Sequence, residues 1–243
     1  MIHRLTFLLL LALCQIASAQ SGKALTFQES PRFKSIRQEI DVELNKLPSS
    51  ERPFKARTRA LMAHKDLAAS PKSLDRALRT LLYRAYALTE VLPTDLPAID
   101  IDDVVKRAPG EVEFLRAKYL NTWRVTKIEK SRELRDALLK RDPKDFLVLL
   151  AASYDESWQG DPNMAITLAE RAHKLEPTNY LTVHRLAIAY HYLYGKKPQV
   201  ATAKKALAYY ETWLKVAPQS APRRKSIENR IKYLEGVIAK GKT

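Results

Sequence analysis

Two histidines, His184 and His191, are the residues whose spacing first suggests metal chemistry. They lie seven residues apart, so on a helix they share one face but are separated by two turns, about 10 Å. Two ligands at that separation cannot hold one metal ion by themselves, and no nearby Asp, Glu or Cys completes a coordination shell. We therefore expect no metal site, and we interpret both histidines as polar binding residues.

The sequence also lacks the residue patterns of common enzyme classes. Its single cysteine, Cys14, lies in the expected signal segment, which leaves the mature chain without a thiol nucleophile. No G-x-S-x-G, no H-E-x-x-H and no glycine-rich phosphate loop is present. The adjacent carboxylates of Asp102 and Asp103 would diverge on a helix, so we interpret them as capping residues. We expect neither enzymatic activity nor a cofactor.

Positive charge is concentrated at the C-terminal end. The net charge is +15, and residues 196–243 hold twelve Lys or Arg against three acids. Such a region can bind phosphate, lipid head groups or an acidic protein face, although solubility alone can also explain it. We do not expect nucleic acid as a partner, because no nucleic-acid-binding motif is present. The residues assigned to this basic patch are Lys196, Lys197, Arg223, Arg224, Lys225, Arg230 and Lys232.

The first nineteen residues have the pattern of a secretory signal. A short basic start precedes an apolar run from Leu5 to Leu13, and residues 17–19 provide the small-x-small cleavage pattern. The apolar run is shorter than the roughly 20 residues that cross a bilayer. Cys14 follows Leu13 rather than a small residue, which argues against a lipoprotein. We predict export to a bacterial periplasm or the exterior, with no transmembrane segment after cleavage.

Helical patterns fill the rest of the chain. Apolar residues recur at i, i+3 and i+4 over about 31–47, 51–68, 71–92 and 222–239, and no long alternating apolar–polar run indicates strands. We predict an all-α fold with a polar linker at 20–29, an N-terminal helical region at 30–107 and a repeat region with a capping helix at 108–243.

A fixed spacing of prolines indicates the repeats. Pro109, Pro143 and Pro177 lie 34 residues apart, and Pro218 follows 41 residues later. Each proline closes a helix-like segment. A period of 34 residues is typical of arrays of helical hairpins.

The stretch from about 111 to 218 resembles the tetratricopeptide repeat family. In one unit, Ser153, Ala165, Ala169 and Ala172 provide the small residues where two helices approach closely, and Pro177 closes the unit. The next unit matches the family's core pattern less regularly, because its turn is about seven residues longer and Trp213 replaces a small residue. A degenerate third unit precedes both. The resemblance implies a right-handed α-solenoid of helical hairpins, ended by a solvating helix.

The resemblance also implies a binding face. In this family the first helix of each hairpin lines a concave groove. Aromatic rings beside cations on that face suit an extended peptide with carboxylate or aromatic side chains. Tyr154, Trp158 and Trp123 could instead fill the core between repeats. The residues assigned to the groove are Arg116, Trp123, Arg124, Tyr154, Trp158, His184, His191 and Tyr192.

These features together predict an exported, non-enzymatic adaptor that holds a protein or peptide in its groove. The alternative is peripheral binding to an anionic envelope component, lipid or polysaccharide, through the basic C-terminal region.

Overall fold

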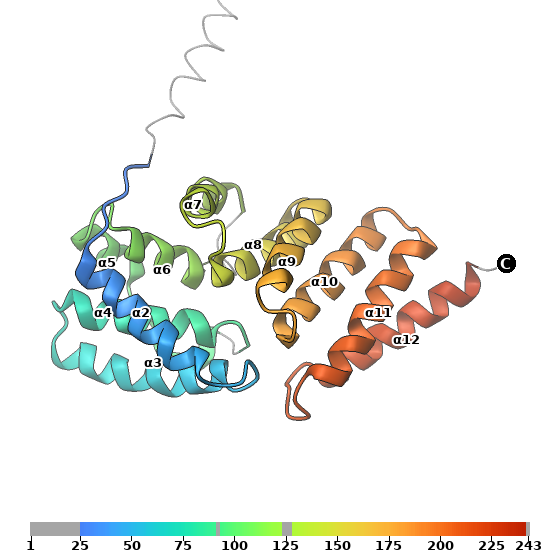
Figure 1. The fold of residues 1–243 in the computed structure, drawn as a ribbon, viewed down its shortest axis with the longest axis horizontal. Coiled ribbons are helices and arrows are strands. Elements are labelled where there is room, and N and C mark those ends of the chain that lie inside the picture. The colour runs from blue at the N-terminus through green and yellow to red at the C-terminus, as the bar shows by residue number, and fades with distance from the viewer. Residues whose placement is uncertain (1–24, 91–92, 123–127, 242–243) are drawn as a thin grey trace, which may run out of the picture.

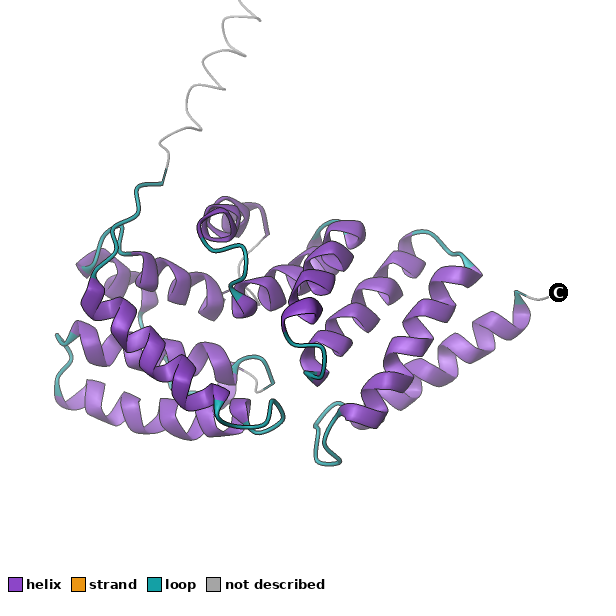
Figure 2. Cartoon of the chain, in the orientation of Figure 1, coloured by secondary structure: helices purple, strands orange, loops and turns teal. Residues whose placement is uncertain are grey.

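The computed structural model describes residues 25–90, 93–122 and 128–241. The expected signal segment, Trp123 and Arg124 lie outside the described residues. Within them the chain is helical and forms no strand, apart from one isolated bridge between Gln28 and Glu111, so the all-α prediction is confirmed for this part (Figure 2). None of the described helices is long and apolar enough to cross a membrane.

Eleven α-helices are present in the described part of the chain. They are α2 (Pro31–Asn45), α3 (Arg52–Ala69), α4 (Leu74–Ala87), α5 (Ile101–Arg107), α6 (Val112–Thr122), α7 (Ile128–Arg141), α8 (Phe146–Gln159), α9 (Pro162–Leu175), α10 (Tyr180–Lys196), α11 (Val200–Val216) and α12 (Arg224–Lys240), and a short 3-10 turn, η1 (Pro93–Asp95), follows α4.

Side-chain caps set where several helices begin. Asp145, Asp161 and Asn179 each accept a hydrogen bond from a backbone N–H in the first turn of α8, α9 and α10. The predicted start of the third helix at Pro71 is wrong, because α4 begins at Leu74. There the Ser73 hydroxyl accepts a bond from the Arg76 N–H, while Pro71 lies in the preceding turn.

Two apolar clusters form the core, and α6 contributes to both. Phe114 and Ala117 of α6 pack in a cluster with α2 to α5. Tyr119 and Leu120, at the other end of the same helix, pack in a second cluster that runs through α7 to α12. α6 therefore joins the N-terminal helices to those that follow.

The helices from α8 onward pack in chain order. Each one contacts the next, and α8 also contacts α10 across α9 (Figure 1). A side-chain contact links this array to the N-terminal helices, because Arg52 at the start of α3 donates to both carboxylate oxygens of Glu176, at 2.8 and 3.0 Å, in the turn after α9.

Trp213, which has a large side chain, is completely buried. Its ring lies 6.3 Å from Tyr180 and 5.9 Å from His184, and the Arg224 guanidinium lies 5.9 Å from it. This side chain thus fills the space between α10, α11 and the start of α12.

We expect Trp213→Ala to lower the free energy of unfolding by about 3–5 kcal/mol, because it removes a large buried side chain and leaves a cavity. Trp158, which is 62% exposed, offers a matched control. Trp158→Ala should cost about 1 kcal/mol, since it loses mainly one aromatic pair. Urea unfolding followed by circular dichroism measures both values, and equal losses would contradict the packing described.

Candidate binding site

Aromatic side chains of α8 and α10 meet at one face of the array. Trp158 stands edge-on to Tyr192, with ring centroids 5.7 Å apart and planes at 83°. The Arg185 guanidinium lies over the Tyr154 ring at 4.9 Å. An exposed tryptophan held at a defined angle by a second ring presents apolar area without first having to lose side-chain freedom.

α12 brings cations to the same face. One cavity of about 90 Å³ is lined by residues of α8, α10 and α12 together. Its lining residues are Tyr154, Trp158, His184, Ile188, Tyr192, Arg223, Ser226, Ile227 and Arg230. Four residues assigned to the groove and two assigned to the basic patch therefore line one site.

A larger, open depression of about 750 Å³ adjoins this cavity and shares Ser226 and Arg230 with it. His191, Lys225 and Tyr233 also line it. None of the described residues lining either hollow is an Asp or Glu. Arg223, Lys225 and Arg230 thus give the combined surface, which we call the aromatic–basic face, a positive potential suited to an anionic group.

His191 contributes no charge to this face near neutral pH. Burial, and then the nearby positive charge of Arg230, lower the pKa of His191 to about 4. Its ring lies 6.0 Å from both Tyr210 and Tyr233. The described residues hold no group of three or more His, Cys, Asp or Glu side chains placed to share a metal ion.

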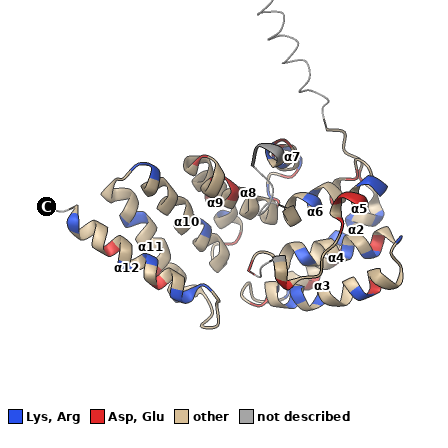
Figure 3. Ribbon diagram, turned by 180° about the vertical axis from the view of Figure 1, so that it is seen from behind, with Lys and Arg blue, Asp and Glu red and all other residues tan. Residues whose placement is uncertain are grey.

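Other residues assigned to the basic patch have different surroundings. Arg224 donates to the Leu214 and Ala217 carbonyls at 3.1 Å each, which caps the end of α11. The Lys196 ammonium donates to the Gly160 carbonyl at 2.6 Å. Lys197 and Lys232 are exposed and line neither hollow. Figure 3 shows Lys and Arg recurring along α12.

Arg116 lies away from the aromatic–basic face. It is buried and donates through Nε and Nη2 to the two oxygens of Asp145, the Nη2 contact being 2.9 Å. Burial opposes ionisation of Asp145, but the charge and hydrogen bonds of Arg116 outweigh it and hold the pKa of Asp145 below its usual value. The groove position expected for Arg116 comes from the resemblance to tetratricopeptide repeats. No local sequence signal reveals its partner Asp145, 29 residues away.

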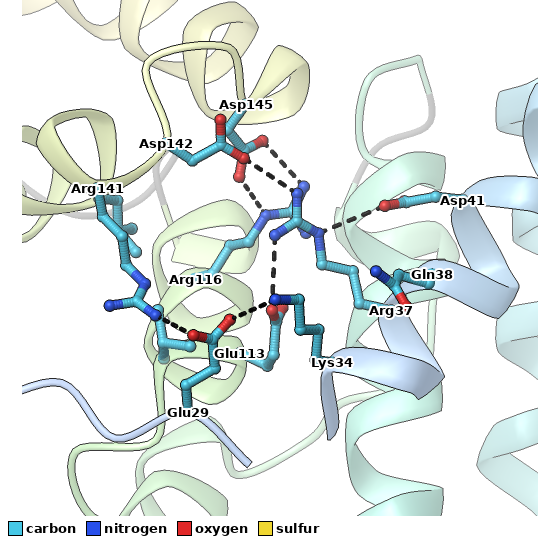
Figure 4. Close-up of a pocket in the computed structure, with 12 residues that line it drawn as sticks. Glu29, Lys34, Arg37, Gln38, Asp41, Glu113, Arg116, Arg141, Asp142 and Asp145 are labelled. Atoms are coloured by element: carbon cyan, nitrogen blue, oxygen red, sulfur yellow. Dashed lines mark hydrogen bonds and ion pairs between the residues drawn. The ribbon is translucent and has the colours of Figure 1, made fainter. Parts of the chain in front are cut away.

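A second, polar cavity of about 510 Å³ contains this ion pair in its wall (Figure 4). Its lining residues come from the segment before α2, from α2, α6 and α7, and from the turn before α8. Residues 29 to 145 contribute, so no local sequence pattern marks this cavity.

Two buried carboxylates of α8 contact side chains of α6 and α7. Glu156 accepts from Arg135 of α7, and Asp155 accepts from the Tyr119 hydroxyl at 3.1 Å. Burial raises the pKa of Asp155 to about 7, despite the hydrogen bond from Tyr119.

Comparison of the chain with protein-family models, with curated proteins and with solved structures finds no significant match.

We expect Asp155 to make stability fall as pH rises. Its pKa is 3.8 as a free group and about 7 in the fold. The folded state therefore keeps the proton longer, and the stabilisation present below pH 3.8 is lost as pH approaches 7. At about 1.4 kcal/mol per unit, Asp155→Asn should gain up to about 4 kcal/mol relative to wild type across this range.

Urea unfolding at a series of pH values measures that difference. Asn keeps an oxygen that can accept from Tyr119, so the variant removes the titration while retaining the shape of the side chain. Asp66→Asn, at an exposed position on α3, is the control. The same pH-dependent difference in both variants would contradict the role given to Asp155.

Proposed function

We propose that this protein is an exported, non-enzymatic scaffold resembling tetratricopeptide proteins, and that it binds an extended segment of a partner protein on the aromatic–basic face. The observation that carries the proposal is the shared cavity, in which Trp158 and Tyr192 lie beside Arg223 and Arg230 with no lining carboxylate. Rings supply area for burial, and guanidinium groups bind carboxylates with two parallel hydrogen bonds.

The packing order supports a solenoid-like arrangement of the repeat region. α8 contacts both α9 and α10, and the pairing then continues through α11 to α12. In such an array, alternate helices share a face. α8, α10 and α12 are the alternate helices here, and they are the ones that line the shared cavity.

The preferred partner segment carries acidic and aromatic side chains. Arg223, which also makes a 3.6 Å contact with Glu90, and Arg230, which donates to the Tyr210 hydroxyl at 3.0 Å, are each held in position by a neighbour. Their orientation is thus partly fixed before binding, which lowers the entropic cost of recruiting an acidic side chain.

Binding to an anionic envelope surface is the second candidate. The exposed positions of Lys197, Lys225 and Lys232 favour it, since lysines that extend into solvent can approach a charged surface without a shaped site. Such binding would depend on charge and little on the tryptophan.

Capture from an envelope extract by immobilised protein distinguishes the two candidates. We expect Trp158→Ala and His191→Ala to lose partner proteins that wild type retains, because both substitutions remove ring area from the face. Circular dichroism is used first to verify that both variants fold. Met164→Ala, at an exposed apolar residue of α9, is the control and should retain them.

Salt provides the second arm of the experiment. Retention on the aromatic–basic face should persist in part when salt is raised from about 50 to about 500 mM, whereas attachment through charge alone should collapse. Full retention by both folded variants would overturn the proposal. Salt-sensitive binding of anionic vesicles that both variants preserve would establish the second candidate in its place.

A further inference from the structure

The polar cavity between α2, α6 and α7 has the size and the wall of a small-molecule site. Its volume of about 510 Å³ lies within the range of ligand pockets. It is separate from the aromatic–basic face, and nine charged side chains line it. The cations are Lys34, Arg37, Arg116 and Arg141, and the carboxylates are Glu29, Asp41, Glu113, Asp142 and Asp145.

This wall is almost balanced in charge. Four cations face five carboxylates, so a simple anion or a simple cation would meet repulsion as well as attraction. A ligand that carries one charge of each sign can instead satisfy both kinds of group and adds no net charge to the cavity.

Two buried side-chain atoms in the wall lack a hydrogen-bond partner. Glu113 and Arg116 are 2% and 4% exposed, and Glu113 Oε2 and Arg116 Nη1 make no hydrogen bond. An unsatisfied buried polar atom destabilises the fold, so a ligand that supplies its missing partner gains affinity. Burial also raises the pKa of Glu113, despite the neighbouring positive charges of Arg116 and Arg37. One acceptor and one donor among the lining residues are thus left without a partner.

The spacing of these groups limits the length of the ligand. Glu113 and Arg116 lie three residues apart on α6, where Cβ atoms are about 5–6 Å from each other. Both side chains therefore leave α6 on the same face, and both line the cavity, so one small ligand can contact both.

Arg37 is the cation that can give way to a ligand. It contacts Asp41, Glu113 and Asp142 at 3.3, 3.5 and 3.3 Å, distances at the long limit of hydrogen bonding, and its side chain is partly exposed (Figure 4). Arg116, by contrast, is held by both oxygens of Asp145. An incoming ammonium can replace Arg37 at Glu113 and Asp142, which frees the Arg37 guanidinium to turn toward the ligand.

We propose that this cavity binds a free α-amino acid as its zwitterion, with the ammonium group on Glu113 and Asp142 and the carboxylate on Arg116 and Arg37. Each charge of the ligand then meets a group of opposite sign, and both unsatisfied atoms gain a partner. The proposal is independent of the function proposed for the aromatic–basic face.

Thermal melting of the protein with each of the standard L-amino acids in turn, followed by saturation-transfer NMR, tests this site. At least one amino acid should raise the melting temperature and show saturation transfer. Its N-acetyl derivative, which lacks the ammonium, and its carboxamide, which lacks the carboxylate, should do neither. Absence of binding across the whole set, or equal binding of the N-acetyl derivative, would overturn the proposal.

A substitution then locates the site. Glu113→Gln should weaken binding of that amino acid at least tenfold, because it removes the charge that faces the ammonium while keeping the side chain's shape. Glu170→Gln, at an exposed position of α9 outside the cavity, should leave the affinity unchanged. Equal affinity of wild type and a folded Glu113→Gln would place the amino acid elsewhere and refute the site. If Glu113→Gln does not fold, the comparison of ligand derivatives on wild type decides.

Discussion

The buried ion pair between Arg116 and Asp145 is the contact on which the arrangement of the later helices depends. One carboxylate accepts from Arg116 of α6 and also caps α8 by accepting from the Val148 N–H at 3.2 Å. The start of α8 is therefore tied to α6. A buried ion pair adds little net stability, but loss of one partner costs about 3–5 kcal/mol, since it leaves a buried charge unpaired. The pair thus specifies where α8 begins more than it contributes to total stability.

The packing of α8 to α12 brings together aromatic and basic residues that are far apart in the sequence. α8 carries Tyr154 and Trp158, and α12 carries Arg230 more than seventy residues later. Packing through α9, α10 and α11 brings both to one face. The buried Trp213 supports this arrangement, because its ring fills the space between α10 and α11.

Local signals in the sequence predict the helices well, and the reasons are physical. Apolar periodicity and capping residues such as Asp161 and Asn179 act within one or two turns, so they are visible in the chain itself. Ser73 shows the limit of such signals. The sequence pattern predicts a helix start at about Pro71, but α4 begins after Ser73, which caps it. The groove residues are expected from the resemblance rather than from these local signals, and four of them line one cavity.

Contacts between distant residues are not visible in this way. The sequence around Arg116 would be the same if its side chain faced a groove or paired with Asp145. Only the three-dimensional structure shows that it pairs with Asp145. The polar cavity is even harder to predict from the sequence, because its charged wall joins residues from five separate segments. In the sequence, each charged residue of this wall taken alone has the pattern of an ordinary solvent-exposed charge.

The two cavities differ in what holds their charges, and this difference determines what each can recognise. In the polar cavity each of the four lining cations has a carboxylate partner, so a ligand must exchange with existing ion pairs. On the aromatic–basic face no Asp or Glu lines the two hollows, and of the lining cations Arg223 contacts a carboxylate outside them, that of the buried Glu90 at 3.6 Å. His191 stays neutral there, because burial lowers its pKa to about 4. Arg223, Lys225 and Arg230 supply positive charge to that face, so binding of an anionic group there responds to salt.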